Sequence, residues 1–207
     1  MANKTNLPSV IKKRLGDIAA IQVGYTFRSR IEADAKGNVL VIQMKDLRDD
    51  GIVRAETLTR THVDDLKKNQ LAFGDDIIFR ARGQNNTAGI ISSDIANAII
   101  AAPLIRMRIA EPMAYPRYVM WFINQPDSQK KLASNAKGTA QKMISKDDLG
   151  QLEISLPAIE HQHKIVEISM LEEKEQRLSS LITSKKAVLI SKKLMKYAKG
   201  ETNHGNE

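Results

Sequence analysis

The sequence predicts an α+β protein in which a β-rich globular domain with interspersed helices is followed by one long helix. Up to residue 157 the chain consists of short apolar segments separated by turn residues, whereas residues 158–199 contain neither Gly nor Pro. The predicted strands and helices do not alternate regularly, which favours α+β over a parallel α/β sheet. We therefore expect a domain at residues 1–157, a helix at 158–199 and a disordered tail at 200–207.

Within the domain, residues 1–14 show no clear period and are expected to have little structure of their own. Leu15–Ile21 is expected to form a short helix that stops before Gly24. Val39–Gln43 and Ile52–Thr61 alternate like two strands around the turn residues Asp49-Asp50-Gly51. The remaining predicted strands are Asp76–Arg80, Gly89–Ser92, Ala96–Ala101, Leu104–Ile109 and Leu152–Leu156. Pro116 and Pro126 open two predicted helices, Arg117–Gln125 and a second one that runs to Asn135.

Composition restricts the class of protein. The formal net charge of +8 and the pI near 9.6 favour an anionic partner, and nucleic acid is the leading candidate. The chain contains no cysteine, which excludes disulfides, thiolate zinc sites and cysteine nucleophiles. It has no apolar run of about 18 residues, and residues 1–14 lack the apolar centre of a signal peptide. We therefore expect a cytoplasmic protein without a membrane partner.

The long helix carries apolar residues at spacings of three, four and seven, the pattern of a coiled-coil seam. The seam consists of Ile165, Ile168, Leu171, Leu178, Leu181, Ile182, Val188, Leu189 and Met195. Packing along its own domain is the simpler alternative. However, a helix of 40 residues is about 60 Å long and exceeds the width of such a domain. We therefore expect much of the seam to pair with a second helix.

Charge is segregated along this helix. All of its acidic residues lie in its first half, at residues 160–179, whereas residues 180–199 contain six lysines and no acid. This distribution suits the helix dipole, and it also suits antiparallel pairing of two copies, because each acidic start then lies beside a basic end. We therefore expect an antiparallel homodimer.

No catalytic constellation is evident. The sequence contains no GxxxxGK[ST], GxGxxG or GxSxG motif. His161 and His163 are two residues apart at a helix start, so they point in different directions. We therefore predict no catalytic residue, no metal and no cofactor. The globular domain is expected to bind a ligand without catalysing a reaction.

Four predicted loops combine basic side chains, amides and small residues that suit double-stranded DNA. Arginine matches the O6 and N7 atoms of guanine, and Asn or Gln matches the N6 and N7 atoms of adenine. Lys142 and Arg28 are expected to contact phosphates, which sets register. The low aromatic content of 4% argues against a platform for single strands. The candidate DNA-binding residues are Tyr25, Arg28, Arg30, Lys45, Arg80, Arg82, Gln84, Asn85, Asn86, Lys137, Thr139, Gln141 and Lys142.

Several stretches together resemble the specificity subunit of type I restriction-modification enzymes. They are Leu15-Gly16-Asp17-Ile18 with Gly24, Leu71–Phe79, Gly138–Lys142 with Ile144-Ser145, and Leu156–Gln162 with Ile165-Val166. The similarity extends from about residue 14 to 199. One departure is Glu160-His161, where the family usually has Glu-Gln. That site begins the long helix and is not expected to contact DNA.

A full-length family member carries two target-recognition domains and two long helices that pair antiparallel, whereas this chain has one of each. The resemblance thus implies half a specificity subunit without catalysis of its own, which docks methyltransferase subunits and, through them, the restriction subunit. Two copies would recognise a gapped palindrome. Three alternatives remain: a half that pairs with a non-identical half, a coiled-coil scaffold or regulatory protein that no longer binds DNA, and an autonomous nuclease or methyltransferase.

Overall fold

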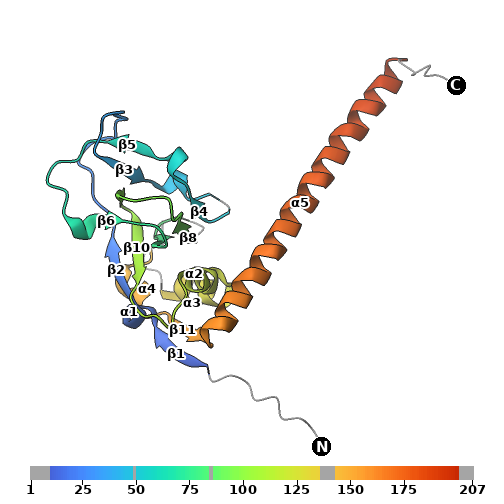
Figure 1. Ribbon diagram of the computed structural model, residues 1–207. Coiled ribbons are helices and arrows are strands. Elements are labelled where there is room, and N and C mark those ends of the chain that lie inside the picture. Colours follow the sequence, from blue (N-terminus) through green and yellow to red (C-terminus); the bar gives the residue numbers. More distant parts are fainter. Residues whose placement is uncertain (1–9, 49, 84–85, 136–142, 201–207) are drawn as a thin grey trace, which may run out of the picture. The chain divides into compact units, whose positions relative to one another are not determined.

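The computed structural model describes residues 10–48, 50–83, 86–135 and 143–200 (Figure 1). The chain divides into two compact units, Met1–His163 and Lys164–Glu207. The first contains the sheets and the short helices, and the second contains most of the long helix, so each unit is described by itself.

The strands are β1 (Ile11–Arg14), β2 (Ala19–Val23), β3 (Val39–Ile42), β4 (Ile52–Val53), β5 (Thr59–Thr61), β6 (Leu71–Ala72), β7 (Ile77–Arg80), β8 (Ala88–Ile91), β9 (Ala98–Ile100), β10 (Leu104–Ile109) and β11 (Glu153–Leu156). The helices are α1 (Leu15–Ile18), α2 (Pro116–Asn124), α3 (Pro126–Asn135), α4 (Lys146–Gly150) and α5 (Ile159–Ala198), with short 3₁₀ turns η1 (Met44–Asp46), η2 (Ala55–Thr57) and η3 (Lys68–Gln70).

Within the described residues these strands form three sheets. A five-stranded sheet has the order β2-β10-β7-β8-β4, and a four-stranded sheet has the order β5-β3-β9-β6. β4 is parallel to β8 and β3 is parallel to β9, whereas the other pairs are antiparallel. β1 pairs separately with β11. The mixture of sheets, short helices and one long helix confirms the α+β prediction.

The five-stranded sheet is covered on both faces. Because successive side chains point to opposite faces, Ile78 and Ile77 of β7 enter different layers. Ile78 joins a buried cluster with Ile42 of β3 and Ile100 of β9. On the opposite side, α2 packs against β8 and α4 against β2. Figure 1 shows α2 and α3 on the side of this sheet that faces away from β3 and β5.

Most of the predicted elements are present, but the two strands predicted on either side of Asp49-Asp50-Gly51 do not pair with each other. β3 pairs with β5 and β9, whereas β4 pairs with β8 of the other sheet. The predicted strand Ile52–Thr61 is interrupted by the η2 turn. Its two ends therefore belong to different sheets, which alternation of apolar residues alone does not reveal.

The amino-terminal expectations also need correction. Residues 11–14 are not without structure, because β1 pairs in register with β11, from Ile11 opposite Leu156 to Arg14 opposite Glu153. This strand is fully exposed and has no apolar alternation to announce it. The predicted helix at Leu15–Ile21 ends at Ile18, and the chain continues directly as β2.

The long helix is confirmed as α5, which runs from Ile159 to Ala198 over 40 residues. Glu160 lies in its first turn and Lys196 in its last, as the helix dipole favours. Gly200 follows with a φ of +72°, a left-handed conformation that ends helices. In the part of the chain that the structure describes, no helix is both long and apolar enough to cross a membrane.

Candidate nucleic-acid interface

Three of the four predicted DNA-binding loops have neighbouring ends. Arg82 forms a β-bridge with Met143, and the Ile144 amide donates to the Ala81 carbonyl at 3.0 Å. The loop after β7 therefore starts beside the residues that follow the predicted loop 137–142. The Arg80 side chain also donates to the carbonyl oxygens of Met44 and Leu47, at 3.1 and 2.8 Å, which joins it to the loop that contains Lys45.

The fourth loop, which follows β2, is linked to the same region through β9. The Tyr25 amide donates to the Ile100 carbonyl at 2.6 Å, and the Ala101 amide donates to the Ile42 carbonyl at 2.8 Å. Ile42 ends β3 immediately before Gln43, where the loop of Lys45 begins. Main-chain hydrogen bonds and the Arg80 side chain thus connect the loop after β2, the loop of Lys45 and the start of the loop after β7.

The predicted DNA-binding side chains differ in their exposure to solvent. Arg28, Arg30, Lys45 and Arg82 are exposed. The half-buried Tyr25 ring packs edge-to-face on Phe27, with 4.9 Å between ring centroids. Gln84, Asn85, Lys137, Thr139, Gln141 and Lys142 lie outside the described residues.

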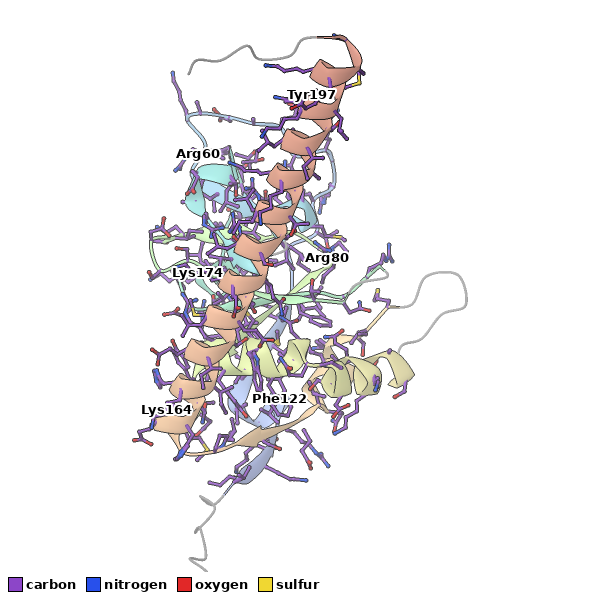
Figure 2. The ribbon with its side chains drawn as sticks, turned by 90° about the vertical axis from the view of Figure 1, so that its right-hand side faces the viewer. Arg60, Arg80, Phe122, Lys164, Lys174 and Tyr197 are labelled. Atoms are coloured by element: carbon purple, nitrogen blue, oxygen red, sulfur yellow. The ribbon has the colours of Figure 1, made fainter. Side chains whose placement is uncertain are left out.

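Two of the predicted DNA-binding side chains, those of Arg80 and Asn86, instead form hydrogen bonds within the protein that stabilise the loop after β7. Arg80 is half-buried, and its Nη2 donates to both carbonyls named above; Figure 2 labels it. The Asn86 side-chain amide donates to the Arg80 carbonyl at 2.9 Å and closes the loop. The geometry assigns both side chains a positioning task, and their contact with DNA remains a prediction.

Sequence inspection missed two arginines of β10. Arg106 is 7% exposed and donates to the Leu71 carbonyl and to Gln22 Oε1, the latter at 2.7 Å. Arg108 binds both carboxylate oxygens of Asp76, at 2.6 and 2.7 Å, and this hydrogen bonding raises the pKa of Arg108. The signal was the alternation Leu104-Ile105-Arg106-Met107-Arg108, which places both arginines on one face of a buried strand.

The predicted seam of α5 is exposed in the single chain. Ile165 is half-buried, whereas the other predicted seam residues are between 49% and 66% exposed. Met170, Ile190, Leu194 and Tyr197 were not predicted and are equally exposed, at 50–69%. Figure 2 shows Tyr197 near the end of the helix. A contiguous row of exposed apolar residues on a helix is typical of an interaction surface.

The first turn of α5 is fixed by Gln162, which is fully buried. Its amide nitrogen donates to the Met113 and Pro157 carbonyls, at 2.7 and 2.8 Å, and its oxygen accepts from the Tyr115 amide at 2.9 Å. The neighbouring His163 ring stacks on Tyr115 with 4.0 Å between centroids. Among the described residues, no group of three or more His, Cys, Asp or Glu side chains could hold a metal ion.

Comparison with known proteins identifies the family. A family model described as the type I restriction modification DNA specificity domain matches residues 10–170. The chain belongs to this family. This specificity-domain chain is 28% identical over 135 residues to the type I restriction enzyme EcoBI specificity subunit of Escherichia coli, a match that covers 64% of the chain and 28% of that protein.

Solved structures have the same fold. The HsdS subunit from Thermoanaerobacter tengcongensis matches with a TM-score of 0.66 at 17% identity, over 99% of this chain and 53% of that one. The S subunit of a type I restriction-modification system from M. genitalium matches with a TM-score of 0.55 at 16% identity, over 90% and 45%. A chain from a type I R-M complex reported for its assembly and conformational transition matches with a TM-score of 0.66 at 18% identity, over 94% and 46%. This specificity-domain chain thus spans about half the length of these structures.

Proposed function

We propose that this protein is the sequence-specific, double-stranded DNA recognition subunit of a type I restriction-modification system. The globular unit recognises one half-site, and two copies pair through α5 as an antiparallel coiled coil to recognise a gapped palindrome. The observation that carries this proposal is the 40-residue helix with an exposed seam, attached to a domain of the specificity family.

The DNA-binding part of the proposal rests on charge and on loop placement. Arg28, Arg30, Lys45 and Arg82 are exposed on loops whose ends are linked by hydrogen bonds. Exposed cations at such loops neutralise phosphates and set the register of the domain on DNA. The base contacts then come from the amides and arginines of the same loops.

The pairing part rests on α5. A seam that is about half exposed along several turns gains burial only from another helix. Glu167, Glu172 and Glu173 lie in the first half of α5, and Lys192 and Lys193 lie in the second half. Antiparallel pairing of two copies brings these opposite charges together, whereas parallel pairing stacks like charges.

The partners follow from this function. Because we propose no catalytic residue in this chain, methylation and cleavage come from the methyltransferase subunits that it recruits and, through them, from the restriction subunit. We also propose a cytoplasmic location, where the assembly meets its DNA target.

Cysteine crosslinking tests the pairing directly, because the chain has no cysteine of its own. Ile168 lies nine residues after the first residue of α5, and Leu189 lies nine residues before its last. In a centred antiparallel pair, Ile168→Cys of one copy faces Leu189→Cys of the other. We expect a mixture of the two variants to form a disulfide-linked dimer, and each variant alone to crosslink poorly.

Strong crosslinking of each variant with itself and none in the mixture would establish a parallel pair and contradict the proposal. Native mass spectrometry of the unmodified chain provides the second readout. A stable monomer at micromolar concentration would favour a half that pairs with a non-identical chain.

DNA recognition is tested by sequencing the methylated positions in a host that expresses this chain with its modification subunit. We expect methylation within a gapped palindrome. An asymmetric target would exclude the homodimer as the active form. Methylation that is the same with and without this chain would exclude DNA recognition and favour the scaffold.

A further inference from the structure

A pocket of about 280 Å³ lies at the end of β2. Its wall includes residues at the end of β2 and just after it, and also Gln70, Ile100 at the end of β9 and Arg106 of β10. None of the predicted DNA contacts except Tyr25 lines it. It therefore needs an explanation of its own.

The backbone of the wall is closely packed. A Cβ atom at Gly24 would lie 2.6 Å from the Ile100 carbonyl oxygen, so only glycine fits there. The neighbouring Tyr25 amide donates to that same carbonyl. The pocket is thus a fixed feature between two strand ends.

Arg106 brings hydrogen-bond donors to the pocket that protein groups do not satisfy. A guanidinium has five N–H donors. Arg106 Nη1 donates to the Leu71 carbonyl and Nη2 donates to Gln22 Oε1, so each of these two nitrogens keeps one further N–H without an acceptor among the described residues. Donors of a buried guanidinium are normally satisfied, so spare Nη donors on a residue that lines a pocket favour an acceptor in that pocket.

The same guanidinium lacks a bonded counter-ion. Within the described part of the chain no carboxylate lies at ion-pair distance from Arg106. The carboxylate of Asp76 is bonded to Arg108 instead. Burial lowers the pKa of Arg106 and Arg108 lowers it further, whereas Asp76 raises it. An almost fully buried cation with only neutral partners is costly, and an anion in the pocket offsets that cost.

The segments that supply the wall are also basic. Arg28 and Arg30 follow the wall residues after β2 in sequence, and Lys67 and Lys68 precede Gln70; all four are exposed. Arginine is well suited to phosphate because its guanidinium offers a planar fork of N–H donors.

We infer that this pocket binds a phosphate group through Arg106, with Gln22 holding the guanidinium in place. The ligand is either a phosphodiester of the DNA backbone or free inorganic phosphate. The first source rests on the proposed function, whereas the second does not.

Gln22→Glu is the sharpest test. The new carboxylate keeps the shape of the side chain and the contact to Arg106 Nη2, so the fold is retained, but it supplies the counter-ion that the pocket lacks. Gln151→Glu, at an exposed position after α4, makes the same change of charge away from the pocket. We expect phosphate to raise the Tm of the unmodified chain and of Gln151→Glu relative to chloride at equal ionic strength. Gln22→Glu is expected to lose at least about tenfold in phosphate affinity.

Urea unfolding checks that Gln22→Glu remains folded. Thr26→Glu, an exposed substitution in the same pocket wall, is the second variant and is expected to lose phosphate binding as well. Equal phosphate binding by the unmodified chain, Gln22→Glu and Thr26→Glu, or none by the unmodified chain, overturns the inference.

The salt dependence of DNA binding then distinguishes the two sources. If the ligand is a backbone phosphate, the slope of log affinity against log salt falls by about one for Gln22→Glu relative to Gln151→Glu. An unchanged slope, together with lost phosphate binding, assigns the pocket to free phosphate. If no variant binds DNA, the proposed function fails, and the phosphate titration still decides the inference.

Discussion

Residues 10–163 and the long helix treat polar and apolar side chains in opposite ways. The globular unit buries Asp76 and Gln162 and supplies hydrogen-bond partners for both of them from its own chain. α5 beyond Lys164 carries Leu178 and Leu189 with about half of each side chain in solvent. The globular unit thus buries most of its apolar side chains within its own chain, whereas the long helix leaves its apolar side chains exposed.

This difference separates two kinds of stability. The globular unit has its own hydrophobic core clusters and internal arginine hydrogen bonds, so its unfolding should not depend on protein concentration. A single helix with half-exposed leucines gains its stability from association, which makes that stability concentration-dependent. Substitutions in the globular unit should therefore change the free energy of unfolding, whereas substitutions in the seam of α5 should change the dissociation constant of the dimer.

The largest effect is expected at the seam of α5. Leu178→Asp places a charge in the pairing face, and a symmetric dimer contains the substitution twice. Burial of a leucine contributes about 1.5–3 kcal/mol to the free energy of association. We therefore expect the dissociation constant of the dimer to rise at least about 100-fold. Analytical ultracentrifugation measures this effect. Ser180→Asp, on the opposite face of α5, is the control, and equal weakening by both substitutions would show that the seam does not pair.

Within the globular unit, the largest effect is expected at Asp76. Asp76→Asn removes the negative charge and one of the two acceptor oxygens that bind Arg108. We expect a loss of about 2 kcal/mol in the free energy of unfolding, because Asp76 is buried whereas the Arg108 side chain is 36% exposed and keeps contact with water. Urea unfolding provides the measurement. Asp127→Asn, from an exposed pair with Lys130, should change it by less than about 0.5 kcal/mol.

Two arginines of the same loop should separate folding from DNA binding. Arg80→Met leaves the Met44 and Leu47 carbonyls without this donor and should cost about 1–3 kcal/mol of stability. Arg82→Met, at an exposed site, should leave stability within about 0.5 kcal/mol and reduce the salt slope of DNA binding by about one. Thermal unfolding and titrations at several salt concentrations would show both. A stability loss at Arg82 as large as that at Arg80 would contradict this division.

The smallest effect is expected at Asp46, which is 4% exposed and accepts from the Gln43 amide at 2.8 Å. Burial raises the pKa of Asp46, although the Gln43 amide and Lys45 lower it. A raised folded pKa means that the stability from protonated Asp46 is fully present below the unfolded pKa and is lost as the pH rises. Asp46→Asn stays neutral, so its stability relative to the unmodified chain should increase from pH 3 to pH 7, by less than about 1 kcal/mol. Urea unfolding at both pH values tests this sign.

Local sequence signals predicted much of the fold. Pro116 and Pro126 marked the starts of α2 and α3, and the absence of Gly and Pro between residues 158 and 199 predicted α5. The short apolar runs gave β7, β8 and β10. These signals succeed because they act within one element.

Long-range pairing was not predictable in the same way. β1 is an exposed strand whose partner lies about 140 residues away, and β4 and β5 belong to different sheets although they are close in sequence. The candidate site shows the same limit. Sequence composition indicated Arg80 as a DNA contact, but its carbonyl partners at Met44 and Leu47 are visible only in the folded chain.

The arginine contacts to Met44, Leu47 and Leu71 share one property: each acceptor is a main-chain oxygen. Every residue type offers that oxygen, so the anchoring does not depend on which side chains the anchored segments carry. Exchange of the residues around such anchor points leaves the support intact. Under the proposed function, substitutions in these loops can therefore change the DNA target while the main-chain contacts that support the loops are kept.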